Sequence, residues 1–360
     1  MSTTIIVKLG DRSYPIHVGA GVWEAVTEYL AGRSPAKITL VTDERVGSLY
    51  GEAMRTILRE ADLDHLYVTF PQGEKSKSFH QLERLCREMA LAGVDREGLV
   101  LALGGGVVGD LAGMAASTYM RGIRLIQLPT TLLAMVDSSV GGKTGINIPE
   151  GKNLVGTFYQ PEGVFADSRV LDTLDERDWY SGLAEVLKIA LTMDEDLFAY
   201  LEGLADLGPD RGLDVARVVS TACMRKADVV RQDEREAGLR RVLNFGHSLG
   251  HAVEAALGYG KVRHGEAVVM GMQAALRLSV DICDLSQEHY DRATSVLRRI
   301  PVPALGSVSG ELEAFLRRDK KSASGSIQVV LLSSIGHYEF VSLKDPVKLV
   351  EALRKSEEGE

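Results

Sequence analysis

The stretch LVLALGGGVVGD at residues 99–110 decides the fold of the N-terminal half of this 360-residue chain. Its first five residues are a continuous apolar run, which indicates a strand buried on both faces of a parallel sheet. Gly104, Gly106 and Gly109 then match the spacing G-x-G-x-x-G. Glycines at the start of a helix leave the backbone N–H groups accessible to a pyrophosphate. The stretch therefore predicts a nucleotide site at the end of a buried strand.

This loop departs from the usual dinucleotide fingerprint in two ways. It follows a middle strand rather than the first one, and the acidic ribose ligand expected about 20 positions later is absent. Asp43, at the end of another predicted strand, could take that part, although its own context favours an ordinary helix N-cap. The alternative interpretation of the loop is a glycine-rich packing turn. We expect a dinucleotide bound by a variant of the usual plan.

Strand and helix periodicities divide the chain into two predicted domains. Residues 1–170 alternate between the two periods and predict a Rossmann-like α/β domain with a parallel sheet. Its expected strands are residues 5–9, 14–18, 37–42, 66–70, 99–103 and 124–128, and its expected helices are 21–31, 45–61 and 81–92. Residues 171–360 predict a domain that is all-helical apart from one short strand pair. Its expected helices are residues 179–192, 212–233, 245–257, 266–282 and 289–299, and the strands are 327–332 and 337–341. We expect a ligand cleft where the domains meet.

Composition and charge restrict the classes of partner. The chain has 41 Lys and Arg against 50 Asp and Glu, a formal net charge of -9, which disfavours nucleic acid as a ligand. Three scattered cysteines indicate reduced thiols and a cytoplasmic protein. The N-terminus lacks the apolar core of a signal peptide, and the most apolar stretch contains three consecutive glycines and an aspartate. We therefore expect no membrane span.

A charged stripe interrupts the apolar stretch GLAEVLKIAL at residues 182–191. Glu185 and Lys188 are three residues apart and share one face of the predicted helix. Burying charge is costly unless a partner or a metal ion compensates for it. The stripe therefore indicates either a structural ion pair or part of a metal or anion site.

Three of the eight histidines fall within 18 residues. His247 and His251 are four residues apart on one helix face, Glu254 continues that face, and His264 precedes another apolar helix. Imidazoles with one carboxylate suit Zn²⁺ with an open coordination position. The alternative is a set of histidines satisfied by ordinary hydrogen bonds, and spacing alone leaves open which groups, Glu185 included, would bind a metal.

Two further features indicate an anionic ligand. Lys226 lies on the apolar face of the predicted helix 212–233, where the alternative is a side chain that extends to the rim. The segment 137–153 places Lys143 and Lys152 beside glycines without forming a Walker A motif. A mobile surface loop is the alternative for that segment.

In order, these segments resemble the 3-dehydroquinate synthase family of the shikimate pathway over nearly the whole chain. The most specific matches are residues 104–110, 141–147, 182–188, 244–251, 264–266 and 319–321. The resemblance implies a Rossmann-like domain, a helical domain and a homodimer. Position 45 is often asparagine in the family and is arginine here. The difference concerns one contact with the ribose, and NAD is still the expected cofactor.

The resemblance also implies the site residues. The matching metal ligands are Glu185, His247 and His264, so that His251 would face the substrate. The matching NAD positions are Asp43, Glu74, Lys77, Gly106, Val107, Val108, Gly109, Asp110, Thr130, Thr131, Lys143, Lys152 and Thr173. The matching substrate contacts are Asp137, Lys143, Lys152, Asn153, Lys188, Lys226, Arg240, Asn244, His251 and Lys320, with Arg121 reaching the phosphate held by the partner protomer.

The reaction implied by this resemblance converts 3-deoxy-D-arabino-heptulosonate 7-phosphate to 3-dehydroquinate and phosphate. It proceeds by transient oxidation with NAD, phosphate elimination, reduction and intramolecular aldol closure, and it uses Zn²⁺, for which Co²⁺ can substitute. One alternative is a cyclase of sedoheptulose 7-phosphate, a substrate without the carboxylate that Arg240 fits. Others are a metal-dependent polyol dehydrogenase, which would release NADH, and a non-catalytic binding protein.

Overall fold

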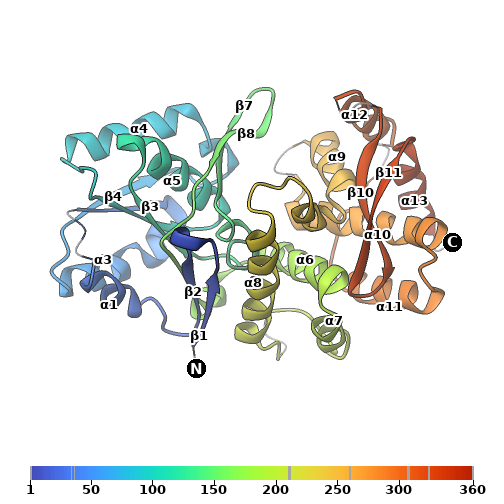
Figure 1. Cartoon of the computed structure of the whole chain (residues 1–360), viewed down its shortest axis with the longest axis horizontal. Helices are drawn as coiled ribbons and strands as arrows, with labels where there is room; N and C mark the ends of the chain where they lie inside the picture. The colour runs from blue at the N-terminus through green and yellow to red at the C-terminus, as the bar shows by residue number, and fades with distance from the viewer. Residues whose placement is uncertain are drawn as a thin grey trace. The chain divides into compact units, whose positions relative to one another are not determined.

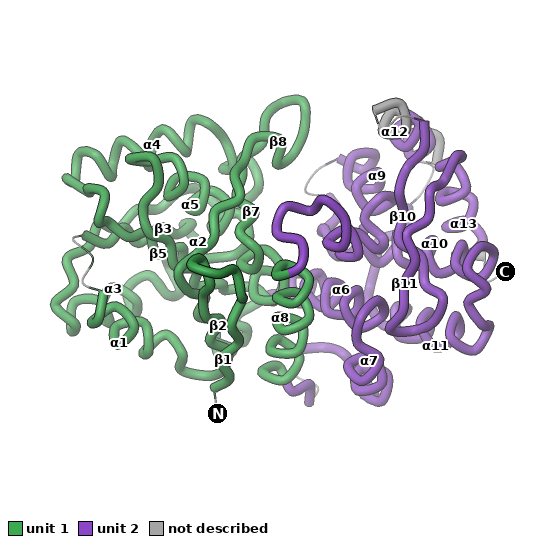
Figure 2. The backbone as a smooth tube through the Cα atoms, viewed as in Figure 1, with its two compact units in different colours: residues 1–174, 215–231 green, residues 175–214, 232–360 purple. Residues whose placement is uncertain are grey.

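In a computed structural model, the chain forms two compact units (Figures 1 and 2). The structure describes residues 2–33, 35, 37–209, 212–258, 261–305, 309–322 and 325–358. Unit 1 comprises residues 1–174 and 215–231, and unit 2 comprises residues 175–214 and 232–360. Helix α8 (Val215–Gln232) therefore belongs to unit 1 except for its last residue. The assignment of cofactor to residues 1–170 and of metal and substrate to 171–360 stays a prediction.

Unit 1 is built on a seven-stranded sheet, which confirms the predicted Rossmann-like α/β fold. The strand order is β1-β2-β9-β6-β5-β3-β4, and all neighbours are parallel except β1 and β2. Every residue of β3 and β5 is buried, as continuous apolar runs predict. The strands are β1 (Thr3–Val7), β2 (Tyr14–Gly19), β3 (Ile38–Asp43), β4 (His65–Phe70), β5 (Leu99–Gly104), β6 (Arg124–Pro129) and β9 (Gly163–Asp167).

Helices cover both faces of this sheet. Along the chain the strands are added toward one edge of the sheet up to β4 and in the opposite direction from β5 onward. Because crossovers are right-handed, the helices before β4 and the helices after it lie on opposite faces. Accordingly α1 and α3 lie on one side and α4 and α5 on the other (Figure 1). The helices are α1 (Ala25–Ala31), α2 (Glu44–Val46), α3 (Glu52–Glu60), α4 (Phe79–Leu91) and α5 (Gly106–Thr118).

Two segments of unit 1 differ from the sequence prediction. The basic segment interpreted as a loop forms an antiparallel hairpin of β7 (Lys143–Ile148) and β8 (Gly151–Phe158). Gly145 pairs with Gly156, where a Cβ atom would lie 2.2 Å from the Thr144 carbonyl oxygen, so glycine permits the close pairing. Strand β9 was not predicted, although all of its five residues are buried in the sheet.

Unit 2 is helical with one two-stranded sheet, as predicted. Its central helix, α10 (His264–Cys283), contacts four other helices and β10. Glycines allow this packing: a Cβ at Gly271 would lie 1.8 Å from the Gly246 carbonyl oxygen, and one at Gly265 would lie 2.2 Å from that of Ser181. The other elements are α6 (Glu176–Met193), α7 (Glu195–Glu202), α9 (His247–Leu257), α11 (Gln287–Leu297), α12 (Ser309–Ser322), α13 (Val347–Glu358), β10 (Ile327–Ser334) and β11 (His337–Leu343).

Two expectations drawn from composition can be compared with the structure. Among the described residues, no helix combines the length and the apolar character needed to cross a membrane. The cysteines Cys86, Cys223 and Cys283 are free thiols. Cys223 is buried and donates to the Met135 carbonyl oxygen, and burial raises the pKa of its thiol to about 12.

Candidate functional site

A buried carboxylate on α6 forms the centre of the unit 2 site. Glu185 is fully buried, and its Oε2 contacts the ammonium of Lys188 one turn further along the helix. Its Oε1 has no hydrogen-bond partner among the described residues. A buried carboxylate oxygen without a donor is costly, so this atom requires a cationic partner.

Two imidazoles face that oxygen. His247 Nε2 lies 3.6 Å from Glu185 Oε1, and His264 Nε2 lies 3.5 Å from it. His247 begins α9 and His264 begins α10, so three helices supply the three groups. Helix α10 packs closely against α6 at Gly265, which meets Ser181. Six residues further along α10, Gly271 packs against Gly246, the residue before α9. These two contacts bring the three helices together. The three groups offer one donor atom each, all within 4.8 Å of one another.

This spacing fits a divalent metal ion. Zinc bonds of 2.0–2.1 Å at a tetrahedral angle place two ligand atoms about 3.3 Å apart. The two carboxylate–imidazole distances, 3.5 and 3.6 Å, are close to that value and longer than ordinary hydrogen bonds. The set of two imidazoles and one carboxylate is one that catalytic zinc sites use, with a fourth position left for substrate or water.

The electrostatics of the three groups agree with a cation site. Burial alone would raise the pKa of Glu185, but Lys188 and the two imidazoles hold it well below its ordinary value. Burial and the Lys188 charge hold the pKa of His247 well below its ordinary value. Burial opposes protonation of His264, but Glu185 and Glu254 raise its pKa to about 10. A metal ion at this position would replace the proton on His264 Nε2.

A second donor set lies on the other side of the same imidazole. His251, Glu254 and His264 also offer donor atoms within 4.8 Å of one another. The rings of His247, His251 and His264 form one cluster, with centroids 5.2–6.1 Å apart. His251 is the exposed member of this cluster, a position from which it could meet a ligand. The structure thus brings together the four candidate ligands that spacing left open, Glu185, His247, His251 and His264, and adds Glu254 to them.

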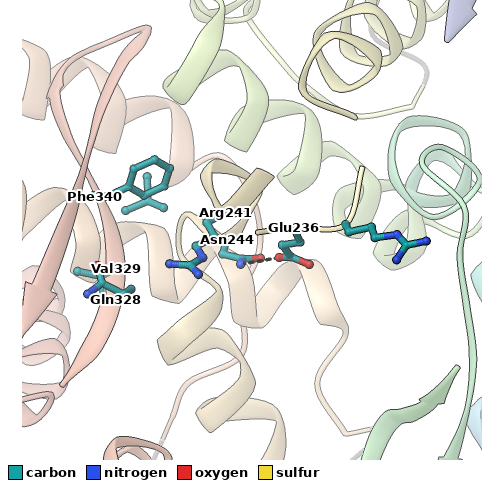
Figure 3. Close-up of a pocket in the computed structure, with 8 residues that line it drawn as sticks. Glu236, Arg241, Asn244, Gln328, Val329 and Phe340 are labelled. Atoms are coloured by element: carbon teal, nitrogen blue, oxygen red, sulfur yellow. Dashed lines mark hydrogen bonds between the residues drawn. The ribbon is translucent and has the colours of Figure 1, made fainter. Parts of the chain in front are cut away.

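The segment before α9 holds two predicted substrate contacts. Arg240 is buried, and its Nη1 donates to the Glu234 carbonyl oxygen at 2.5 Å. Asn244 Nδ2 donates to Glu236 Oε1 at 3.0 Å, and these two side chains point toward one another in Figure 3. Asn244 lines a cavity of about 360 Å³, which sequence reasoning did not identify. The lining residues are Arg235, Glu236, Arg241, Asn244, Gln328, Val329, Val330 and Phe340.

In unit 1, the glycine loop and Asp43 lie at neighbouring strand ends. Parallel β3 and β5 pair through Thr42 and Leu103, so Asp43 and Gly104 end their strands at the same sheet edge. The helices that follow these strands cover opposite faces, and ligands of open α/β sheets bind at such a switch point. Asp43 Oδ1 accepts from the Val46 N–H at 2.9 Å, so the N-cap favoured from its context is present.

A side chain would be crowded at each of the three motif glycines. A Cβ at Gly104 would lie 2.3 Å from Val108, and one at Gly109 would lie 2.9 Å from Gln127 of β6. A Cβ at Gly106 would lie 3.1 Å from the Ser138 hydroxyl. These contacts support the packing interpretation of the loop, and the nucleotide site stays a prediction. Helix α5 begins at Gly106, within the motif, so the glycines lie at a helix N-terminus, the position at which anions bind in such folds.

A buried lysine joins α5 to the β7–β8 hairpin. Lys77 Nζ donates to Asp110 Oδ2 at 2.6 Å and to Asn153 Oδ1 at 2.5 Å, and lies 3.7 Å from Glu74. Burial works to lower the pKa of Lys77, but the carboxylates of Asp110 and Glu74 raise it above its ordinary value. Asn147 donates to Glu74 Oε1 at 2.8 Å and completes the connection. The structure thus brings four residues predicted for NAD or substrate into one network.

A second lysine of unit 1 pairs with a predicted substrate contact. Lys226 of α8 donates to the Asp137 carbonyl oxygen at 2.7 Å and forms an ion pair with the Asp137 carboxylate. Its ammonium therefore does not extend to the rim as the alternative proposed. Asp137 lies in a single-turn π-helix, Ala134–Ser138, that follows β6.

The remaining predicted residues lie after β6, in the β7–β8 hairpin and in helical segments. Thr130 and Thr131 directly follow β6, and the Thr173 hydroxyl lies 2.6 Å from that of Tyr50. Lys143 and Arg121 are exposed, and Lys152 is half-buried. The backbone of Arg121 has a φ of 70°, a strained value for a residue other than glycine. Lys320 falls in α12, but its side chain lies outside the described residues.

Comparisons with known proteins match both halves of the chain. Residues 67–181 match the N-terminal domain of 3-dehydroquinate synthase, and residues 182–322 match its C-terminal domain. The 3-dehydroquinate synthase of Acidithiobacillus ferrooxidans is 42% identical over 354 residues, which are 98% of this chain and 97% of that protein.

Two solved structures share the fold over nearly their whole length. One is 2-epi-5-epi-valiolone synthase from Streptomyces hygroscopicus subsp. jinggangensis 5008 with NAD⁺ and Zn²⁺ bound. It matches with a TM-score of 0.87 and 31% sequence identity, and the match covers 98% of this chain and 99% of that one. The other is 2-deoxy-scyllo-inosose synthase complexed with carbaglucose-6-phosphate, NAD⁺ and Co²⁺, with a TM-score of 0.89, 25% identity and the same coverage. From the match of both domains and the identity to curated relatives, this chain belongs to the 3-dehydroquinate synthase family.

Proposed function

We propose that the chain catalyses the 3-dehydroquinate synthase reaction of the shikimate pathway, which forms 3-dehydroquinate and phosphate from 3-deoxy-D-arabino-heptulosonate 7-phosphate. The observation that carries the proposal is the buried Glu185 oxygen that faces His247 Nε2 and His264 Nε2 at zinc-ligand spacing. Family membership supplies the substrate, and the relatives with bound NAD⁺ and Zn²⁺ or Co²⁺ supply the cofactors.

Two groups that the chain itself does not provide would carry the redox and Lewis-acid chemistry. Bound zinc would polarise the hydroxyl group to be oxidised, and NAD would accept a hydride and return it within each turnover. Glu185, His247 and His264 would hold the metal. Asp43, the glycine loop and the Lys77–Asp110 network would hold the dinucleotide at the switch point of the unit 1 sheet.

The protein's own side chains would bind and orient a substrate that carries two anionic groups. Arg240 suits the carboxylate because its guanidinium can donate two parallel hydrogen bonds. Lys152, Asn153, Lys226 and His251 are proposed to hold the phosphate, and the remaining matched residues position the sugar hydroxyls. Arg240 and Lys226 are buried and Lys152 is half-buried in a chain whose formal net charge is -9, so the overall charge does not exclude an anionic substrate.

We further propose that the enzyme is a cytoplasmic homodimer. Free cysteines support a reducing compartment. The exposed Arg121, held in a strained backbone conformation, is the residue proposed to reach the phosphate of the partner protomer. Sedimentation of the purified protein tests the dimer. A second experiment mixes Arg121→Ala chains with chains made inactive by a change at Glu185. Partial recovery of activity in the mixture would support a site that takes Arg121 from the partner protomer.

Removing the metal should abolish activity reversibly. Prolonged dialysis against a chelator is expected to reduce phosphate release to background, because the hydroxyl group loses its Lewis acid. Adding Zn²⁺ or Co²⁺ should restore it. Circular dichroism of the dialysed protein provides the control, since α6, α9 and α10 pack through apolar and glycine contacts independent of the metal. Full activity in verified metal-free protein would refute the metal centre.

Asp43→Ser should separate the two roles assigned to this residue. Serine caps a helix about as well as aspartate, so the free energy of unfolding should change by less than about 0.5 kcal/mol. The lost contact between a carboxylate and the ribose should weaken NAD binding about 10-fold. Isothermal titration with NAD measures the affinity, and Asp43→Ala, which also removes the cap, serves as the comparison. Unchanged NAD affinity in both variants would leave Asp43 with the cap alone.

A further inference from the structure

We propose that Glu254 is a positioning residue that fixes the ring of His264 for metal binding, and the inference rests on the proposed metal centre. Glu254 lies on α9 and is 6% exposed. Its Oε2 lies 3.1 Å from His264 Nδ1. A metal-binding histidine usually donates its second ring N–H to a carboxylate or a carbonyl oxygen, which fixes both the tautomer and the orientation of the ring.

Both proposed histidine ligands show this arrangement. His247 Nδ1 lies 3.2 Å from the Phe245 carbonyl oxygen, and its Nε2 faces Glu185. His264 Nδ1 meets Glu254, and its Nε2 also faces Glu185. An acceptor on each Nδ1 directs the lone pair of each Nε2 toward the same carboxylate oxygen. The two acceptors differ in kind, because one is a backbone group and the other is a charged side chain that a mutation can remove.

The distances distinguish this role from direct metal binding by Glu254. A separation of 3.1 Å lies within the range of an N–H···O hydrogen bond. The contacts of Glu185 with the two imidazoles are longer and leave room for an ion. Glu185 Oε1 also lacks a hydrogen-bond partner among the described residues, which creates the demand for a cation on that side of His264.

Helix periodicity explains how one helix supplies both functions. His247 and Glu254 are seven residues apart, two turns of α9, so they share a face. That face packs against the start of α10. Gly250 of α9 lies so close to it that a Cβ atom there would be 3.2 Å from the carbonyl oxygen of Ala267 in α10. Helix α9 therefore contributes one ligand and the group that orients another.

Zinc affinity measured by competition with a chromogenic chelator tests the proposal. Glu254→Ala should weaken zinc binding about 10- to 100-fold, the usual loss when a group that orients a metal ligand is removed. Glu254→Gln, which keeps an acceptor oxygen but loses the charge, should fall between Glu254→Ala and the unaltered chain. The absorption bands of bound Co²⁺ should shift in both variants, because the geometry of the His264 ligand changes.

Matched variants separate this role from a structural one. Glu202→Gln breaks a bidentate ion pair with Arg292 in the same unit and should leave zinc affinity unchanged. Glu185→Gln should abolish zinc binding. Unchanged affinity in both Glu254 variants, an equal loss in Glu202→Gln, or retained zinc in Glu185→Gln would overturn the inference. Absence of zinc binding by the unaltered chain would instead refute the proposed metal centre, on which the inference depends.

Discussion

His264→Ala should lower the rate of phosphate release about 1,000-fold or more, since a catalytic metal contributes several kcal/mol of transition-state stabilisation. The variant loses one of three proposed ligands, and it also leaves the buried Glu185 with fewer positive neighbours. Purified variant protein should therefore contain little zinc by elemental analysis. The fold should survive, because His264 begins α10 and the helix is held by its buried apolar face.

His289→Ala is the matched control for this prediction. His289 lies on α11 in the same unit, away from the groups that could hold a metal ion. It should keep both zinc and activity. If His264→Ala retains stoichiometric zinc while its circular dichroism is unchanged, the assignment of His264 as a ligand is wrong.

Gly271→Ala should destabilise unit 2 by at least about 3 kcal/mol, at the upper end of what overpacking costs. The added Cβ would lie 1.8 Å from the Gly246 carbonyl oxygen and 2.8 Å from its carbonyl carbon. These are backbone atoms, so no side-chain rotation relieves the clash, and α10 has to move away from the residue that precedes α9. That movement also separates His247 from His264. Urea unfolding followed by circular dichroism measures the loss of stability.

Gly203→Ala supplies the comparison within the same unit. Gly203 ends α7 with helical backbone angles, φ -72° and ψ -11°, and a Cβ there would make an ordinary contact of 3.4 Å with the Ala199 carbonyl oxygen. Its unfolding midpoint should stay the same or rise slightly, because alanine reduces the entropy of the unfolded chain. An unfolding midpoint for Gly271→Ala equal to that of Gly203→Ala would contradict the packing described for α10.

Local patterns predicted the parts of the fold that depend on local sequence. The apolar run at residues 99–103 and the glycines after it predicted β5 and the start of α5 because each signal lies within one element. The hairpin β7–β8 was wrongly interpreted as a loop, since glycine and lysine are typical of loops and its pairing depends on residues about ten positions apart. Strand β9 was missed because Gly163 and Asp167 leave an apolar run of only three residues between them.

The candidate site divides in the same way. Helical spacing placed Glu185 and Lys188 on one face and His247, His251 and Glu254 on another, and the structure brings these faces together. Spacing could not show which nitrogen of His264 faces Glu185 and which faces Glu254, because that depends on how α6, α9 and α10 pack.

The same limit applies to ion pairs between distant residues. Lys226 was correctly noted as a cation on an apolar face, but its partner Asp137 is 89 residues away in the chain. Lys77 and Asp110 are likewise joined only by tertiary structure. The resemblance to the family named all four residues, and the structure adds the contacts among them.

The most direct measurement of the central proposal follows phosphate, 3-dehydroquinate and absorbance of NADH together. Zinc-loaded protein would receive 3-deoxy-D-arabino-heptulosonate 7-phosphate with NAD far below the substrate concentration. We expect equal amounts of phosphate and 3-dehydroquinate over many turnovers of NAD, with no net NADH. Accumulation of NADH in proportion to product would indicate a dehydrogenase, and turnover of sedoheptulose 7-phosphate in place of the heptulosonate would indicate another cyclase. Either result would contradict the proposed function.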